Sequence, residues 1–307
     1  MLDCDQYLMP ATLDEALDLM ERHKGRHRVI AGATDLLPAT RQGRVGDIHV
    51  PVLIDIGGLE SLKDVRLVGK RVRIGAATPI ARFMDDPVLK EHLPIMLHCA
   101  VWFADDQLRE AATLGGNLVN ASPAADAMPP MIAMNGAVIM ERLENGRRDR
   151  RALPIEEFVT GPGRTRLREG ELVTAVECDS MAGYGGAFEK VGHRRSLVLS
   201  TVCLAALVKP DRDGRVFEDV RLALGAVGPV PCRLRDCEAT LVGQPISRAV
   251  IEAAARLVPD RVQSRTRREY RAEVVANFLT RGVRDALAEL GIGQDASEHA
   301  EKEVGYG

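Results

Sequence analysis

The sequence predicts an α+β protein made of packed units, and three observations carry this prediction. The chain has 307 residues, which is more than one compact core usually holds. Its apolar fraction of 46% and its charged fraction of 28% are those of a globular protein. Short strand-like and helical segments alternate in the first part of the chain, and longer strands followed by helices make up the rest. We therefore expect three units, over 1–58, 59–178 and 179–290, and a disordered tail over 291–307.

Residues 1–58 are expected to form a small α/β unit. Thr12 and Glu15 have the spacing of a capping box, and apolar side chains then recur at helical spacing. The expected elements are a helix over 13–24, a strand over 28–30, a short helix, and a strand over 52–56. The first strand runs directly into the sequence AGATD at 31–35.

Residues 59–178 are expected to form an α+β unit that is interrupted by one loop. The expected elements are a hairpin over 67–76, a helix over 79–84 capped by Thr78, a helix over 94–103, a helix over 127–134 capped by Asp126, and strands over 137–141 and 171–178. The loop is ATLGGNLVNASPAAD at 112–126, in which two glycines precede small polar residues.

Residues 179–290 are expected to form a sheet followed by helices. The expected strands cover 185–191, 196–208 and 219–227, and the expected helices cover 233–242, 247–258 and 267–288. A run of strands followed by a run of helices is typical of a separate lobe.

Composition excludes several classes of protein. The net charge of −3 gives no general attraction to nucleic acid. The longest apolar stretch, 197–208, is shorter than the roughly 20 residues that cross a bilayer. The first residues lack the pattern of a signal peptide, so we expect a cytoplasmic protein. The six cysteines form no CxxC pair, and His23 and His27 have no third ligand nearby, so we expect no metal site.

Two glycine-containing turns are candidates for binding an anion. In AGATD at 31–35 and TLGGN at 113–117, small residues leave backbone N–H groups accessible, and such groups bind phosphate. Thr34, Thr113 and Asn117 add polar side chains, and Asp126 could accept hydrogen bonds from sugar hydroxyls. The alternative is that both segments are ordinary turns. The chain has no GxGxxG, P-loop, GxSxG or HExxH motif, so its chemistry would have to come from a bound cofactor.

Taken together, six colinear blocks resemble the FAD-binding medium subunit of molybdenum hydroxylases, a group that includes the carbon monoxide, xanthine and nicotinate dehydrogenase types. The blocks are VIAGATDLLP at 29–38, RIGAATPI at 73–80, TLGGNLVNASPAADAMPPMIAM at 113–134, FVTGPGRTRLREGELVTAVE at 158–177, FEKVGHRRS at 188–196 and SRTRREYRAEVVANFLTRGV at 264–283. The resemblance implies a vanillyl-alcohol-oxidase (PCMH)-type FAD-binding fold. It also implies a C-terminal lobe of antiparallel sheet plus helices.

The resemblance also implies which residues contact a non-covalently bound FAD. They are Ala31, Gly32, Ala33, Thr34, Asp35, Thr113, Gly115, Gly116, Asn117, Asp126, Leu172, Lys190 and Leu199. The two turns would bind the pyrophosphate, and Asp126 would lie near the ribose of the adenosine half. Leu172 would contact the adenine or flavin region, Lys190 would approach the pyrimidine edge of the flavin, and Leu199 would lie against its ring. No residue is assigned a catalytic role.

Three positions depart from the pattern of the family. Ala33 replaces a second glycine, so this position must avoid a positive φ or accept strain. Arg109 is not followed by the Asn-x-Gly that the family often has, so the loop before the second turn is expected to shift. Leu199 occupies a position that is aromatic in some relatives.

The resemblance implies an oxidoreductase subunit that passes electrons through FAD to an external acceptor. Its expected partners are a small subunit with 2Fe-2S clusters and a large subunit with a molybdenum–pterin centre, assembled as a dimer of heterotrimers. Two alternatives remain open. One is a self-contained FAD-dependent reductase or oxidase with the same fold. The other is a structural subunit that has lost its flavin. Against it stand the retained candidate residues Thr113, Gly115, Gly116, Asn117 and Asp126.

Overall fold

A computed structural model of the chain describes residues 2–41, 48–194, 197–264 and 266–293. Contacts between residues divide the chain into two compact units. Unit one consists of Met1–Val88, Phe103–Ser122 and Asn135–Ser180, and unit two consists of Leu89–Trp102, Pro123–Met134 and Met181–Gly307. The three-part division expected from the sequence stays a prediction. The expected tail lies outside the described residues from position 294 onward.

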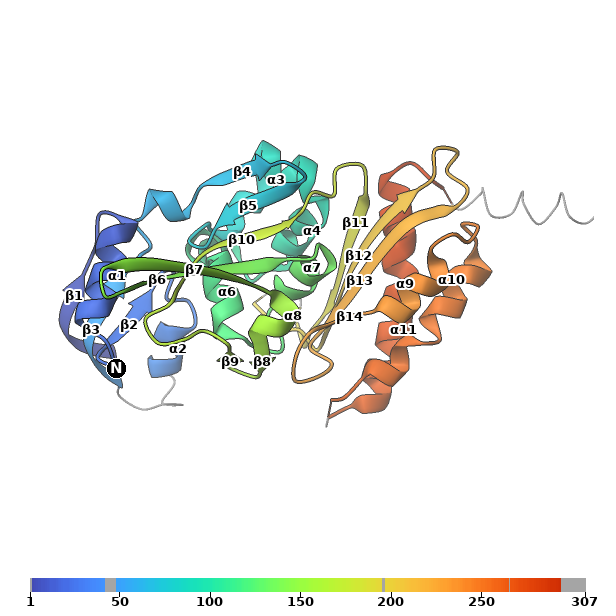
Figure 1. Cartoon of the computed structure of the whole chain (residues 1–307). Coiled ribbons are helices and arrows are strands. Elements are labelled where there is room, and N and C mark those ends of the chain that lie inside the picture. Colours follow the sequence, from blue (N-terminus) through green and yellow to red (C-terminus); the bar gives the residue numbers. More distant parts are fainter. Residues whose placement is uncertain (1, 42–47, 195–196, 265, 294–307) are drawn as a thin grey trace, which may run out of the picture. The chain divides into compact units, whose positions relative to one another are not determined.

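The first sheet of unit one is parallel and has three strands in the order β1-β3-β2 (Figure 1). The elements of this region are β1 (Leu2–Leu8), α1 (Leu13–Arg22), β2 (His27–Ile30), α2 (Leu36–Arg41) and β3 (Ile48–Asp55). The expected capping box is confirmed, because Thr12 Oγ1 accepts from the Glu15 N–H at 3.1 Å. The buried side chains of α1, such as Leu17 and Met20, share one core with Ile54 of β3.

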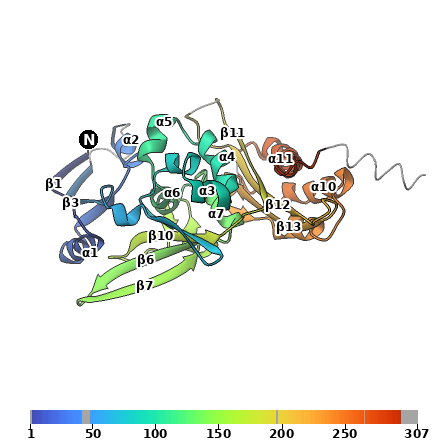
Figure 2. The ribbon, with the colours of Figure 1, turned by 90° about the horizontal axis from the view of Figure 1, so that it is seen from above.

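The second sheet of unit one is antiparallel and has the strand order β4-β5-β10-β6-β7. Its strands are β4 (Val65–Val68), β5 (Arg71–Gly75), β6 (Ala137–Glu144), β7 (Arg147–Pro154) and β10 (Leu172–Asp179). The expected hairpin over 67–76 and the strands near 137–141 and 171–178 are confirmed. Figure 2 shows β6 and β7 as a long hairpin. We did not expect β7, because its sequence RRDRRALP lacks alternating apolar residues.

Unit one also contains short elements between its longer strands. They are η1 (Glu60–Leu62), η2 (Ile80–Met84), α5 (Asp106–Ala111), α6 (Leu114–Asn120), α8 (Ile155–Phe158), β8 (Val159–Gly161) and β9 (Arg164–Thr165). Two expectations were wrong. Thr78 caps no helix, because the 3-10 turn follows Pro79 and the buried Thr78 hydroxyl has no hydrogen-bond partner among the described residues. The expected loop over 112–126 contains the helix α6.

Unit two is a four-stranded antiparallel sheet with helices on both faces. Its strands are β11 (Gly185–Val191), β12 (Val202–Pro210), β13 (Phe217–Gly225) and β14 (Cys232–Arg233). Its helices are α3 (Pro87–His92, which begins in unit one), α4 (Pro94–Trp102), α7 (Met128–Ala133), α9 (Arg235–Leu241), α10 (Arg248–Ala255), η3 (Val258–Arg261) and α11 (Arg268–Glu289). Gly185 packs against Ala286 of α11 and Gly186 packs against Ile95 of α4. Because neighbouring residues of a strand point to opposite faces, α4 and α11 cover opposite faces of the sheet.

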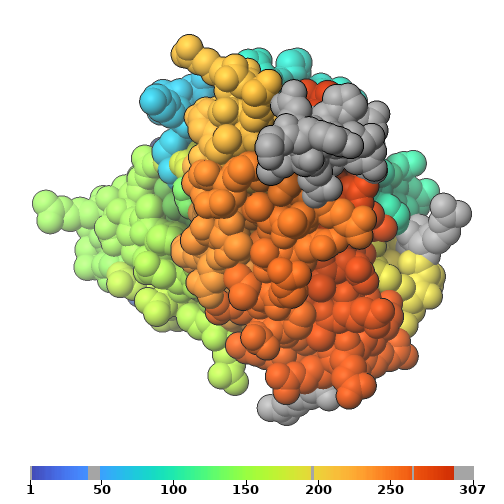
Figure 3. All heavy atoms as spheres, turned by 90° about the vertical axis from the view of Figure 1, so that its right-hand side faces the viewer, coloured from blue at the N-terminus to red at the C-terminus, as the bar shows by residue number. Residues whose placement is uncertain are grey.

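The C-terminal helices of unit two match the three helices expected from the sequence. Figure 3 shows the side of unit two on which these segments lie, in orange and red. The expected strand over 196–208 was wrong at its start, because β12 begins at Val202 and residue 196 lies outside the described part.

Among the described residues, every helix is too short or too polar to cross a bilayer. In the same part of the chain, no group of three potential ligand side chains could hold a metal ion.

Candidate FAD site

A cavity of about 700 Å³ lies within unit one, and most of the candidate residues line it. Its walls are formed by residues of the parallel sheet, of α6 and of the start of β10. The candidate residues that line it are Ala31, Gly32, Ala33, Thr34, Asp35, Thr113, Gly115, Gly116, Asn117 and Leu172. The two turns are separated by almost eighty residues of sequence, yet the fold brings them to the same cavity.

The first turn offers unpaired hydrogen-bond donors to this cavity. The backbone N–H groups of Gly32, Ala33 and Thr34 have no hydrogen-bond partner within the described part of the chain. Most backbone N–H groups in proteins are paired, and consecutive unpaired N–H groups beside a cavity are a feature typical of anion sites. The chain can leave these groups unpaired because β2 ends at Ile30 and α2 begins only at Leu36.

Close packing against the protein's own backbone requires a glycine at position 32. A Cβ atom at this position would lie 1.8 Å from the carbonyl oxygen of Ala111, at the end of α5. Likewise, a Cβ atom on Gly115 would lie 2.7 Å from the carbonyl oxygen of Ala76. Both glycines therefore leave room for the protein's own backbone, and the expectation that they also let a ligand approach stays a prediction.

Ala33, which stands where the family often has glycine, adopts a strained backbone conformation. Its φ angle is 55°, in the left-handed region that costs an L-residue roughly 1–2 kcal/mol. We expect Ala33→Gly to raise the free energy of unfolding by about 1 kcal/mol, measured by urea denaturation. The control is Ala112→Gly, at a φ of −64°, which we expect to lower it by about 0.5–1 kcal/mol. An equal loss of stability in both variants would contradict the strain at Ala33.

The second turn is the first turn of α6, and most of its donors are already paired. Thr113 is the N-cap, and its Oγ1 accepts from the Gly116 N–H at 3.1 Å. The other donors are Leu114 N–H to Thr78 O at 3.0 Å, Gly115 N–H to Ala76 O at 2.8 Å and Asn117 N–H to Thr113 O at 3.0 Å. The second turn therefore has fewer free backbone donors than the sequence suggested.

Two polar side chains in the cavity lack protein partners that satisfy them. The Oδ1 atom of Asn117 is buried and accepts no hydrogen bond from the described residues. Burying an unpaired amide oxygen is unfavourable, so this atom is available to a bound molecule. Asp35 also lines the cavity, and burial raises the pKa of its carboxyl group.

Asp126 and Lys190 form a buried ion pair within unit two. Lys190 Nζ lies 2.5 Å from Asp126 Oδ2 and donates to the carbonyl oxygen of Trp102 at 3.1 Å. Ser200 Oγ donates to Asp126 Oδ1 at 2.6 Å. The expected capping of α7 by Asp126 was wrong, because the N-cap is Ala127 and no side chain caps this helix. Burial raises the pKa of Asp126, and the contacts with Lys190 and Ser200 oppose that rise.

The ion pair limits the roles that the resemblance implies for Asp126 and Lys190. Those roles place Asp126 near the adenosine ribose and Lys190 near the flavin ring, at the two ends of an extended FAD. Two groups 2.5 Å apart cannot lie at both ends, so at least one of the two roles has to change. Asp126 also neutralises Lys190, which weakens its attraction for negative charge on a flavin.

Leu199, the last of the candidate residues, is 74% exposed and does not line the cavity. The thiols of Cys99 and Cys203 are buried near Asp126, and burial is the main cause that raises the pKa of both. They stay protonated and unreactive at neutral pH.

Sequence reasoning missed one wall of the cavity. Leu167, Arg168, Glu169, Gly170 and Glu171 line it directly before β10. The charged run RTRLREGE at 164–171 carries the Gly170 turn that could have drawn attention to this segment.

Family models and curated relatives match the chain along most of its length. The model of the FAD binding domain in molybdopterin dehydrogenase matches residues 3–178. The model of the CO dehydrogenase flavoprotein C-terminal domain matches residues 187–286. The xanthine dehydrogenase FAD-binding subunit of Escherichia coli O157:H7 is 28% identical over 95% of this chain and 99% of its own. The nicotine 6-hydroxylase medium subunit of Paenarthrobacter nicotinovorans is 30% identical over 92% of this chain and 97% of its own.

Solved structures share the fold. Carbon monoxide dehydrogenase from Hydrogenophaga pseudoflava superposes with a TM-score of 0.83 at 26% identity, covering 92% of this chain and 97% of that one. Quinoline 2-oxidoreductase from Pseudomonas putida 86 gives a TM-score of 0.83 at 23% identity, covering 94% and 97%. The expected fold class and the resemblance are both confirmed. The chain belongs to the family of FAD-binding subunits of molybdopterin dehydrogenases, and it is the flavoprotein subunit of an oxidoreductase.

Proposed function

We propose that the chain binds one FAD in the cavity of unit one and acts as the electron-exit subunit of a molybdenum hydroxylase. The observation that carries this proposal is the row of unpaired N–H groups at Gly32, Ala33 and Thr34, which lines a cavity of about 700 Å³. A pyrophosphate matches such donors in charge and in hydrogen-bonding capacity. When bound, FAD takes up electrons from one partner and gives them to another.

Each cavity residue has a role that its chemistry allows. The first turn would hold the pyrophosphate, because its backbone donors are free. Asn117 would bind a polar group of FAD, and Asp35, which is a poor partner for phosphate when ionised, would accept from a hydroxyl group. Leu172, only 5% exposed, would pack against the adenine or flavin region. The roles of Asp126, Lys190 and Leu199 stay predictions, subject to the limit that the ion pair sets.

The proposed partners follow from the kind of complex to which the relatives belong. The relatives include medium chains of carbon monoxide dehydrogenase and glyceraldehyde dehydrogenase. A structure similar in fold belongs to a Cu,Mo-CO dehydrogenase. We propose that this chain receives electrons from 2Fe-2S clusters of a small subunit, which obtains them from a molybdenum–pterin centre in a large subunit. A dimer of heterotrimers in the cytoplasm is the proposed assembly.

Asn117 gives a prediction in which stability and binding change in opposite directions. We expect Asn117→Leu to raise the unfolding free energy of the flavin-free chain by about 1 kcal/mol, because it removes a buried unpaired amide oxygen. The same change should weaken FAD binding about tenfold, because one hydrogen bond to the cofactor is lost. Urea denaturation and flavin fluorescence titration measure the two effects. Loss of stability together with unchanged FAD affinity would show that Asn117 serves the fold alone.

Purification of the tagged chain from its native cells tests the electron-exit role. We expect two further subunits to co-purify, one with the absorbance of 2Fe-2S clusters and one that contains molybdenum. Bound flavin should be bleached when a substrate of the large subunit is added without an acceptor. A chain that purifies alone with FAD and reduces or oxidises a small substrate by itself would instead establish a self-contained flavoenzyme.

A further inference from the structure

The wall of the cavity formed by residues 166–171 is an irregular loop. It connects β9 to β10, and its residues Leu167 to Gly170 line the cavity without belonging to a helix or strand. Its backbone has few anchors of its own. The Arg166 N–H donates to Phe158 O at 2.8 Å, and the Glu171 N–H donates to Arg168 O at 3.1 Å. A loop of this kind needs side-chain contacts to keep one conformation.

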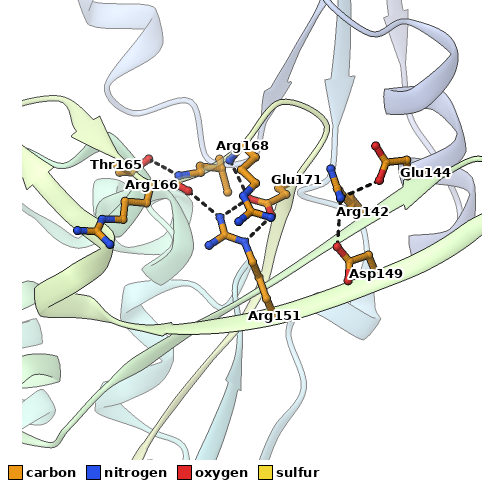
Figure 4. Close-up of polar contacts among 9 residues, drawn as sticks. Arg142, Glu144, Asp149, Arg151, Thr165, Arg166, Arg168 and Glu171 are labelled. Carbon is orange, nitrogen blue, oxygen red and sulfur yellow. Dashed lines mark hydrogen bonds and ion pairs between the residues drawn. The ribbon is translucent and has the colours of Figure 1, made fainter.

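One guanidinium group ties the two ends of this loop together. Arg151 on β7 donates through Nε to Glu171 Oε1 at 2.5 Å and through a terminal nitrogen to Glu171 Oε2 at 2.6 Å. The same terminal nitrogen donates to the carbonyl oxygen of Arg166 at 2.7 Å. Figure 4 shows the Arg151 side chain reaching from β7 to both groups. Arg151 itself does not line the cavity.

The carboxylate at the centre of these contacts is buried and fully engaged. The Glu171 side chain is 2% exposed, whereas that of Arg151 is 21% exposed. Glu171 Oε2 also accepts from the Arg168 N–H at 2.7 Å, which fixes the middle of the loop. Burial alone would raise the pKa of Glu171, but the hydrogen bonds from Arg151 and from the Arg168 N–H lower it. The pair is therefore ionised at neutral pH, and its bidentate geometry is the strong form of this contact.

We propose that Arg151 is a positioning residue for the FAD cavity, which holds the loop 166–171 in its binding conformation through Glu171 and the Arg166 carbonyl. The inference rests on the proposed function, because the ligand is the FAD assigned above. The loop is ordered before the cofactor arrives, so binding does not have to offset the entropy of fixing it. Arg151 therefore sets how long FAD stays bound, although it touches no part of it.

Neighbouring arginines on the same hairpin show that Arg151 differs from an ordinary surface charge. Arg142 pairs with Glu144 and Asp149 on the hairpin itself (Figure 4). Arg150 is 54% exposed and lies 3.4 Å from Glu177. Within the described residues, neither Arg142 nor Arg150 contacts the loop, and an exposed pair such as that of Arg150 contributes little. Arg150 is therefore a matched control, one residue away on the same strand.

Hydrogen exchange and FAD release together test the proposal. In the flavin-free chain, we expect Arg151→Met to speed amide exchange in 166–171 at least tenfold and to leave α1 and β12 unchanged. In the loaded chain, we expect FAD to dissociate about tenfold faster, as measured by the rise of flavin fluorescence on dilution. Arg150→Met should change neither rate. Because Arg151→Met leaves a buried carboxylate unpaired, the double variant Arg151→Met with Glu171→Gln repeats both measurements without that charge.

The outcomes separate this inference from the proposed function. Faster exchange of the loop and faster FAD release in both Arg151 variants, with Arg150→Met unchanged, would support the positioning role. Unchanged loop exchange, or faster exchange with unchanged FAD release, would overturn it. A wild-type chain that takes up no FAD would overturn the proposed function and the ligand named in this inference. Loop exchange in the flavin-free variants would even then show whether Arg151 holds the loop.

Discussion

The Lys190→Met variant is expected to unfold with a free energy about 3–5 kcal/mol lower than that of the wild-type chain. Lys190 and Asp126 are each less than a tenth exposed, and Lys190 Nζ lies 2.5 Å from the carboxylate. Removing the ammonium group leaves a buried charge whose other partner is the neutral Ser200 hydroxyl. Urea denaturation can be followed by the fluorescence of Trp102, the single tryptophan of the chain, whose carbonyl oxygen accepts from Lys190.

A double variant and a surface variant control this experiment. Lys190→Met with Asp126→Leu removes both charges and should recover most of the lost stability, because a buried ion pair can be replaced by apolar groups at little cost. Arg248→Met removes a cation that is 83% exposed and pairs with Glu252, which is itself 41% exposed, so it should cost much less. A loss below 1 kcal/mol for Lys190→Met would show that the ion pair does not matter for stability.

The Gly32→Ala variant is expected to lose about 3 kcal/mol of stability, and with it most FAD binding. The added methyl group would lie 1.8 Å from the Ala111 carbonyl oxygen, and this neighbour is backbone, which cannot rotate away as a side chain can. Relief would require the first turn to shift away from α5, which would move the N–H groups of Ala33 and Thr34. Thermal unfolding and FAD titration measure both effects.

Gly58→Ala is the matched control for this prediction. Gly58 also lies in a turn of unit one, but a Cβ atom there would meet no atom within 4 Å, and its φ angle is not positive. We expect it to leave stability within about 0.5 kcal/mol of the wild type, because a surface substitution without new contacts has little effect. Gly32→Ala behaving like Gly58→Ala would contradict the close packing at the first turn.

The sequence predicted those elements whose pattern is local. Helix α1 follows from the Thr12 capping box and its apolar spacing, and β11 to β13 follow from apolar runs. Strand β7 was missed because four of its first five residues are arginines, whose contacts with acidic groups on other strands no local pattern reveals. Helix α6 was missed because Gly115 and Gly116 argue for a turn. Gly115 is tolerated in the helix because the absence of a side chain lets it pack closely against Ala76.

The sequence indicated which turns line the cavity, but it did not indicate the hydrogen bonds and ion pairs of the candidate residues. The sequence named both turns, but it could not show that α6 uses its own donors while Gly32 to Thr34 keep theirs free. Asp126 looked like a cap or a sugar-binding carboxylate, because its partner Lys190 is 64 residues away. Likewise, the conformation of the loop 166–171 depends on the contact between Arg151 on β7 and Glu171, which lies directly before β10, and only the fold brings these two residues together.

Binding of FAD to unit one through the pyrophosphate can be measured by titrating the flavin-free chain with FAD and, separately, with riboflavin. We expect about one FAD bound per chain, since the row of free donors at Gly32, Ala33 and Thr34 serves one pyrophosphate. We also expect riboflavin, which lacks phosphate, to bind at least a hundredfold more weakly, because charge-assisted hydrogen bonds are the strong ones. Equal affinity for the two flavins, or no uptake of FAD, would show that unit one does not bind FAD through its pyrophosphate.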